Sequence, residues 1–209
     1  MSKRKTVSAG VGSGALPKII VFDLDGTLWY PEMYMLWSGG GSPFKPHPQR
    51  PDRLLDRSGT EVKLMGNSYD LMRSLALDPV FRDQGVTFGV ASTCDEPEWA
   101  AECMQKLMVT TSSDEGGQRN MTNLFHFNEI YKASSKQTHF RNIQKKAKAH
   151  YGQEIAFKDM IFFDNQTDNT RSVSKLGVHC VYTPDGMTEE HWIQGLEQWR
   201  AAHGRHSDL

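Results

Sequence analysis

Residues 18–28 read Lys-Ile-Ile-Val-Phe-Asp-Leu-Asp-Gly-Thr-Leu, an apolar run that leads directly into two carboxylates. The run from Ile19 to Phe22 predicts a buried β-strand. Because side chains alternate along a strand, we expect Asp23 and Asp25 to point the same way at its carboxyl end. Two neighbouring carboxylates repel each other and are costly to desolvate, and a divalent cation that prefers oxygen ligands, such as Mg²⁺, relieves both problems. The stretch therefore predicts a magnesium-binding carboxylate pair.

Two simpler interpretations of this string do not fit. An EF-hand calcium loop needs a third acid two residues after Asp25, where this chain has Thr27. An ordinary surface turn does not follow directly from an apolar strand. The string from the apolar run to Leu28 resembles motif I of the haloacid dehalogenase (HAD) superfamily.

Length and composition exclude several classes of protein. The chain has 209 residues and a net charge of −1, which fits one domain and gives no sign of a nucleic-acid or membrane-surface binder. No apolar run is long enough for a transmembrane helix. Three cysteines without metal-ligand spacing are typical of a reducing compartment. We expect a cytoplasmic monomer with neither a nucleic-acid nor a membrane partner.

The chain ends are expected to lie outside the fold. Residues 1–17 are basic and then rich in Gly and Ser, without the apolar segment of a secretory signal, and predict a disordered tail. Residues 18–203 are expected to form one domain, and residues 204–209 a short C-terminal tail.

Strand and helix patterns alternate along the domain. The expected strands cover 19–22, 86–91, 124–131, 160–163 and 178–182, and the expected helices cover 68–77, 97–108, 136–151, 171–176 and 188–202. This alternation predicts an α/β fold, with a parallel central sheet and helices on both faces. Ligands of such sheets bind beyond the carboxyl ends of the strands, where the residues after each strand meet.

Residues 29–64 interrupt the alternation. They contain five prolines and the run Gly39 to Gly41, which is too broken for a helical cap domain. A hairpin is expected between 53–55 and 61–64. A connection of this length is usually functional, so we expect it to shape the substrate site.

Phosphoryl transfer through an enzyme carboxylate needs a nucleophile, an acid/base, a cation and donors that hold the phosphate. Asp23 is the candidate nucleophile and Asp25 the candidate acid/base. Asp164 follows an apolar strand and could complete a Mg²⁺ site with Asp23 and the backbone carbonyl of Asp25. Ser92 and the backbone N–H of Thr93 follow another strand and could donate to the phosphate.

Lys136 begins a predicted helix and could balance the charge of the carboxylates and the phosphate. Each of these later residues also has an ordinary explanation. Ser92 could be a turn residue, Lys136 a solvated side chain and Asp164 a helix cap. Their order along the chain, acid pair, Ser, Lys and Asp, is the order of the HAD motifs, and that order favours a shared site.

The resemblance narrows to the cap-less magnesium-dependent phosphatase family within HAD, of acid phosphatase and phosphotyrosine type. The matching strings are Phe-Asp-Leu-Asp-x-Thr-Leu-Trp at 22–29, Pro-Phe-Lys-Pro at 43–46, Ser-Lys-x-Thr-His-Phe at 135–140 and Phe-Phe-Asp at 162–164. The resemblance implies a three-layer Rossmannoid fold without a large cap domain. It also implies a Mg²⁺-dependent phosphatase acting on phosphomonoesters of small molecules, sugars or phosphotyrosine.

The chain departs from the family pattern at three positions. The family usually has Tyr where this chain has Gly26, and Arg where it has Thr93. The second acid of the fourth motif is Asn165 here, which could still orient a metal-bound water. Asp168, expected one helical turn from Asp164, is the candidate for supplying the missing charge.

Two other functions stay open at this point. A phosphomutase would use the same fold, although without a cap little would retain its intermediate. A degenerate HAD domain could serve as a protein-binding module, although such a module has no need of two carboxylates. Near the site, Trp29, Tyr30 and Phe44 could form an aromatic wall for a substrate ring or could simply pack the long loop onto the domain.

Overall fold

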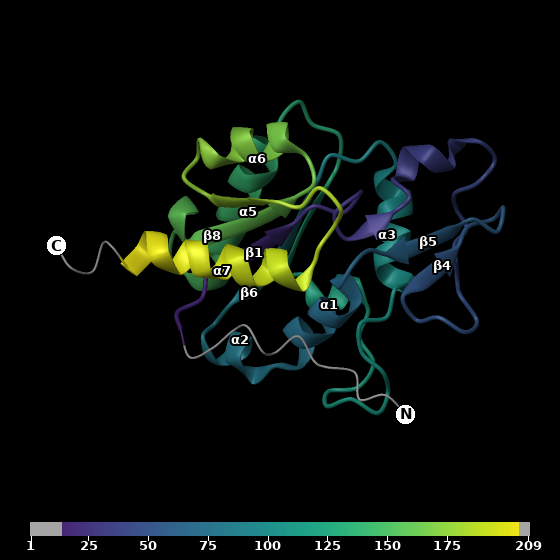
Figure 1. Cartoon of the computed structure of the whole chain (residues 1–209), viewed down its shortest axis with the longest axis horizontal. Helices are drawn as coiled ribbons and strands as arrows, with labels where there is room; N and C mark the ends of the chain where they lie inside the picture. The colour runs from purple at the N-terminus through teal and green to yellow at the C-terminus, as the bar shows by residue number, and fades with distance from the viewer. Residues whose placement is uncertain (1–13, 205–209) are drawn as a thin grey trace.

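Strand β1 (Ile19–Phe22) lies at the centre of a five-stranded parallel sheet in the computed structural model, which describes residues 14–204 (Figure 1). The strand order is β7-β6-β1-β8-β9. The other strands are β6 (Thr87–Ser92), β7 (Phe127–Ile130), β8 (Met160–Asp164) and β9 (His179–Tyr182). Every neighbouring pair in this sheet is parallel, so all the carboxyl ends lie at one edge.

Alternate residues of β1 enter two separate apolar cores. Ile20 and Phe22 pack in the core beneath helices α1 (Ser68–Leu77), α2 (Pro79–Asp83), α3 (Pro97–Lys106), α4 (Met121–Leu124) and α7 (Glu189–Gly204). Ile19 and Val21 pack on the opposite face with α5 (Lys136–Tyr151) and α6 (Thr167–Ser174). Helices therefore cover both faces of the sheet, and the prediction of an α/β fold without a large cap domain is confirmed.

A second, antiparallel sheet follows β1, with strand order β2-β5-β4-β3. Its strands are β2 (Trp29–Tyr30), β3 (Lys45–Pro46), β4 (Arg53–Leu55) and β5 (Glu61–Leu64), and the 3₁₀ helix η2 (Met33–Trp37) joins β2 to β3. The expected hairpin is present as β4 and β5. In its turn the Asp56 carboxylate accepts hydrogen bonds from the backbone N–H groups of Gly41, Ser58 and Thr60 at 2.8–2.9 Å.

Several element boundaries differ from the sequence expectation. Strand β7 begins only at Phe127, because the short helix α4 precedes it and the Asn120 side chain caps that helix. Helix α6 begins at Thr167, four residues before the part that the sequence indicated. Its first turn, Thr-Asp-Asn-Thr, has no apolar residue, so periodicity gives no sign of it. A second 3₁₀ helix, η3 (Phe157–Asp159), leads into β8.

Residues at both ends of the described chain pack onto the domain. Leu16 is buried, and its N–H donates to Gln84 Oε1 at 3.2 Å. The Arg200 guanidinium donates to the Ala15 carbonyl at 2.9 Å. Residues 14–17 are therefore part of the fold, contrary to the expected tail, and Gly204 belongs to α7. The rest of both predicted tails, residues 1–13 and 205–209, lies outside the described residues.

The close approach of α7 to the sheet gives a test of the packing. A Cβ at Gly195 would lie 2.9 Å from side-chain atoms of Phe163 and of Val181. We expect Gly195→Ala to lower the free energy of unfolding by up to about 2 kcal/mol, since overpacking costs roughly 1–3 kcal/mol and alanine recovers only about 1 kcal/mol of helix propensity. Thermal unfolding measures the difference.

Gly204→Ala is the matched control at the end of the same helix, where a Cβ would meet nothing within 4 Å. This variant is expected to unfold at the wild-type temperature or slightly above it. A Gly195→Ala protein as stable as Gly204→Ala would contradict the packing of α7.

Candidate active site

A pocket of about 410 Å³ opens at the carboxyl edge of the parallel sheet. Four residues predicted from the sequence line it, namely Asp23, Asp25, Thr93 and Lys136. They come from the end of β1, the end of β6 and the start of α5, three segments far apart in the chain. Parallel topology thus brings the predicted residues together as expected.

Lys136 lies at the bottom of this arrangement. Its ammonium group donates to Asp23 Oδ1 at 2.5 Å and to Asp164 Oδ2 at 2.6 Å, so the two carboxylates share one cation. The Lys136 side chain is only 2% exposed, and those of Asp23 and Asp164 are 6% and 0% exposed. Ser135 caps α5 by accepting from the Gln137 N–H at 3.2 Å, which fixes Lys136 as the first residue of the helix.

The electrostatics of this buried group leave an excess of negative charge. Burial raises the pKa of Asp23 from 3.8 to about 7, although the Lys136 ammonium opposes the shift. Burial alone would lower the pKa of Lys136, but the carboxylates of Asp23 and Asp164 raise it above its usual value. Lys136 is therefore a fixed positive charge, and one such charge does not fully balance two desolvated carboxylates.

Asp25 is held apart from this pair. Its Oδ1 accepts from the Trp29 indole N–H at 2.6 Å, and its Oδ2 accepts from the Met33 backbone N–H at 3.3 Å. Burial raises the pKa of Asp25, and these two hydrogen bonds partly oppose the rise. The Cys94 sulfur lies 3.7 Å from Oδ2, and burial raises the pKa of this thiol to about 12, which disfavours a cysteine nucleophile.

The fourth motif is organised around Asp164. Its Oδ1 accepts from the Gln166 N–H at 2.7 Å, and the Asn169 amide donates to both carboxylate oxygens at 3.1–3.2 Å. The Asn165 N–H donates to the Thr27 hydroxyl at 3.0 Å. Asn169 was not predicted, because an amide five residues after the acid carries no recognisable motif.

Two departures from the family pattern lie in contact. A Cβ at Gly26 would lie 2.2 Å from the Asn165 amide nitrogen, and Gly26 has a φ of +74°. The Asn165 side chain therefore occupies the space beside position 26, and the absence of a side chain there leaves it room. Gly26 and Asn165 act as one structural feature rather than two.

Four predicted residues do not line the pocket, namely Ser92, Asp164, Asn165 and Asp168. Asp164 nevertheless bonds Lys136 and Asn169, which do line it. The Asp168 side chain is 90% exposed and pairs with Arg171 at 3.1 Å, so it does not supply a second charge beside Asp164. Ser92 is buried at the end of β6, where its carbonyl accepts from the Tyr131 N–H. The neighbouring Thr93 faces the pocket instead.

Some of the aromatic residues after β1 are buried in the fold, and others are exposed. Trp29 and Phe44 are fully buried and pack the second sheet onto the domain, so neither forms a substrate wall. Tyr30 is 45% exposed and does not line this pocket. Tyr34 does line it, together with Glu32, Asp95 and Gln166, none of which the sequence identified.

The donors present fit a magnesium ion. Within residues 14–204, no group of three or more His, Cys, Asp or Glu side chains is arranged as a metal site. The candidate donors are instead the carboxylates of Asp23 and Asp164 and the backbone carbonyl of Asp25. The two carboxylates lie close together, because each has an oxygen bonded to the Lys136 ammonium nitrogen. An all-oxygen set with few protein ligands suits Mg²⁺, which keeps several of its waters, and the excess negative charge favours a cation.

Comparison with known proteins agrees with this geometry. Residues 15–202 match the family described as Acid Phosphatase. The chain belongs to the acid phosphatase family. It is 32% identical over 187 residues to Magnesium-dependent phosphatase 1 of Homo sapiens, and the alignment covers 90% of this chain and 89% of that protein. It is also 32% identical over 164 residues to a HAD-like hydrolase superfamily protein of Schizosaccharomyces pombe, covering 78% of this chain and 83% of that one.

Solved structures show the same fold at low identity. The N-terminal part of a Bacteroides fragilis protein, which contains a phosphatase domain and is in complex with Mg, aligns over 93% of this chain and 42% of that one, with a TM-score of 0.51 and 15% identity. A predicted HAD-like family hydrolase from Porphyromonas gingivalis aligns over 88% of this chain and 98% of that one, with a TM-score of 0.50 and 13% identity. The HAD-like fold and the resemblance drawn from motif I are confirmed.

Because the pKa of Asp23 is raised in the folded state, the stability of this acid phosphatase without metal should depend on pH. The folded state holds a proton on Asp23 that the unfolded state releases above about pH 4. In EDTA, the stability of the wild type should therefore fall as pH rises from about 4 to 7. We expect Asp23→Asn to be more stable than the wild type in EDTA at pH 8, with an upper bound of about 4 kcal/mol.

Unfolding by urea across pH 4–8 measures this difference, and added Mg²⁺ should stabilise the wild type much more than Asp23→Asn. Asp168→Asn is the matched control, since Asp168 is exposed and should give the wild-type profile. An Asp23→Asn curve parallel to that of the wild type would show that the Asp23 charge is not costly in the fold.

Proposed function

We propose that this chain is a Mg²⁺-dependent phosphomonoester hydrolase that works through an aspartyl-phosphate on Asp23. One observation carries the proposal: a buried carboxylate at the end of the central strand, held by Lys136 and opening into a pocket. Phosphatase activity follows from the matched family, and the name of the human relative supports the magnesium requirement.

Asp23 is suited to attack phosphorus. Lys136 and the Thr27 hydroxyl each bond one of its carboxylate oxygens, at 2.5 and 3.2 Å, so the group is fixed in orientation before substrate arrives. The Lys136 charge favours the anionic form of Asp23 by opposing the rise in its pKa, and it offsets the negative charge of an incoming phosphate. The backbone N–H of Thr93, which follows β6 beside β1, would donate to a phosphate oxygen.

Asp25 would give its proton to the leaving oxygen and then accept a proton from the attacking water. Burial raises the pKa of Asp25, so this group stays protonated to a higher pH than an ordinary aspartate. That property suits a general acid. The Trp29 and Met33 hydrogen bonds hold the carboxyl group ready beside the pocket.

Asp23, Asp164 and the backbone carbonyl of Asp25 would hold the magnesium ion, and Asn165 would orient one of its waters. When bound, the ion would neutralise the phosphate oxygens during transfer. The Asn169 amide and the Gln166 N–H both donate to the Asp164 carboxylate and so hold it in place as a ligand for the ion.

The substrate is a phosphomonoester, and we propose phosphotyrosine or a sugar phosphate as its class. Tyr34, 42% exposed at the pocket, offers a ring face to either. No helix in residues 14–204 is long and apolar enough to cross a membrane. The cytoplasmic location, the monomeric state and the lack of nucleic-acid partners stay predictions from the sequence.

The nucleophile assignment is tested by Asp23→Asn, because an amide keeps the shape of the side chain but does not attack phosphorus. We expect turnover of p-nitrophenyl phosphate with Mg²⁺ to fall by a factor of about 10³ or more, as for loss of a catalytic nucleophile. Asp168→Asn should retain wild-type turnover. Circular dichroism confirms that both variants are folded. Wild-type activity in Asp23→Asn would refute the proposed function.

The role of Asp25 is tested with a series of aryl and alkyl phosphates. Asp25→Asn should slow alkyl phosphates far more than p-nitrophenyl phosphate, because acid catalysis matters least when the leaving oxygen is a weak base. The measurement is kcat/KM against the pKa of the leaving alcohol for both proteins. An equal loss for every leaving group would instead indicate that Asp25 acts only in positioning.

A further inference from the structure

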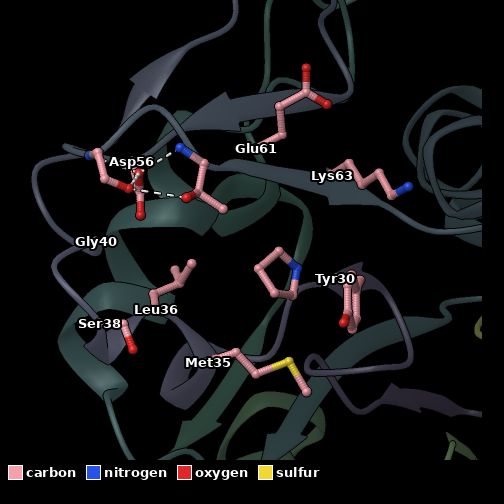
Figure 2. A pocket seen from close by; sticks show the side chains of 11 residues that line it. Tyr30, Met35, Leu36, Ser38, Gly40, Asp56, Glu61 and Lys63 are labelled. Atoms are coloured by element: carbon pink, nitrogen blue, oxygen red, sulfur yellow. Dashed lines mark hydrogen bonds between the residues drawn. The ribbon is translucent and has the colours of Figure 1, made fainter.

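A second pocket, of about 430 Å³, lies beside the candidate active site, between η2 and the second sheet (Figure 2). Met35 and Leu36 line it from η2, and Glu61 and Lys63 project from β5 on the opposite side. It is as large as the catalytic pocket, and nothing in the proposed mechanism uses it.

One short segment separates the two pockets. We call residues 31–37, which contain η2, the ridge. Glu32 and Tyr34 of the ridge line the catalytic pocket, whereas Pro31 and Met35 line the second pocket. Met33 is fully buried beneath them. The ridge is therefore a common wall, with different side chains on its two sides.

The ridge and its neighbour Tyr30 expose most of the large apolar side chains on the surface. Five such side chains are exposed within residues 14–204, and four of them are here, with only Tyr182 elsewhere. Met35 is 40% and Trp37 58% exposed. The Trp37 indole N–H donates to Glu96 at 2.8 Å, which anchors the ridge while its ring faces solvent. An exposed apolar group beside a pocket is typical of an interaction site.

The second pocket is also lined by two carboxylates, Asp56 and Glu61, and by one ammonium group, Lys63, that forms no ion pair with them. The Asp56 carboxylate is satisfied within the hairpin turn, as the dashed lines in Figure 2 show, and Glu61 pairs with Arg53 at 2.5 Å. The exposed Lys63 has no carboxylate partner among the residues that the structure describes. A ligand with an apolar part and a nearby carboxylate would complement this pocket.

The length of the ligand follows from the width of the ridge. A five-residue 3₁₀ helix is about 10 Å long, and its side chains make it nearly as wide. A phosphomonoester of one sugar or one aromatic ring, with its phosphate at Asp23, is too short to cross this wall. An extended peptide spans about 3.3–3.6 Å per residue, so about three residues suffice.

We propose that the second pocket is a subsite for phosphorylated polypeptides, and this inference rests on the proposed phosphatase function. With a phosphorylated residue in the catalytic pocket, the chain crosses the ridge over Tyr34 and Met35. An apolar side chain about three residues away enters the second pocket, and an adjacent acidic residue pairs with Lys63. The ridge thereby selects a polypeptide over a small phosphate ester.

The test compares two phosphotyrosine peptides on the full-length protein with Mg²⁺. One carries Leu-Asp at the third and fourth positions on either side of the phosphotyrosine, and the other carries Ser-Lys there. We expect the wild type to prefer the Leu-Asp peptide in kcat/KM by about tenfold, mainly through KM. Lys63→Glu should reduce this preference by about fivefold, and Met35→Ser should reduce it to a similar extent.

Lys45→Glu is the matched control, because Lys45 is an exposed lysine in β3 of the same sheet and does not line the second pocket. It should keep the wild-type preference. Equal preferences for both peptides in the wild type, or equal effects of Lys63→Glu and Lys45→Glu, would overturn the inference.

Binding separates failure of the subsite from failure of the proposed function. If the wild type does not hydrolyse p-nitrophenyl phosphate, the proposed function fails, and the affinity of both peptides for the protein still tests the subsite by fluorescence anisotropy. A Leu-Asp peptide that binds no more tightly than the Ser-Lys peptide in that measurement also overturns the inference.

Discussion

The bridge from the Lys136 ammonium to Asp23 and Asp164 is the interaction on which the rest of the site depends. It joins the end of β1, the end of β8 and the first residue of α5, all nearly inaccessible to solvent. Buried ion pairs gain little net stability, because desolvation offsets their attraction. Loss of the Lys136 ammonium would nevertheless be costly, since it would leave both carboxylates buried and unpaired. The bridge therefore fixes geometry more than it stabilises the fold, and α5 must begin where it does for Lys136 to reach both carboxylates.

The same bridge explains why the site needs a further cation. One ammonium serves two desolvated carboxylates, and burial raises the pKa of Asp23 to about 7 despite that ammonium. Replacement of the second acid by Asn165 reduces the charge beside Asp164, and Asp168 does not restore it. Asn169 and the Gln166 N–H stabilise Asp164 as neutral donors instead. The chain thus satisfies its fourth motif with hydrogen bonds where the family pattern has charge.

The sequence predicted the site best where topology alone decides position. Asp23, Thr93, Lys136 and Asp164 lie at boundaries of strands or helices, and the order of a parallel sheet brings such boundaries together. The direction in which the side chains of a helix point could not be predicted in this way, because it depends on the residue at which the helix begins. Because α6 begins at Thr167, Asp168 points to solvent and the amide of Asn169 reaches Asp164.

Burial of aromatic side chains was equally hard to predict. The buried Trp29 ring donates its indole N–H to Asp25 across the turn at Gly26, a local contact that periodicity does not show. That hydrogen bond also links the second sheet to the candidate acid/base. The ridge follows directly after β2, and its Met33 N–H bonds the same carboxylate. A polypeptide that settles on the ridge would press on the segment that holds Asp25. With the proposed subsite occupied, the insertion would connect the binding of a polypeptide to the position of the candidate acid, through the Met33 hydrogen bond.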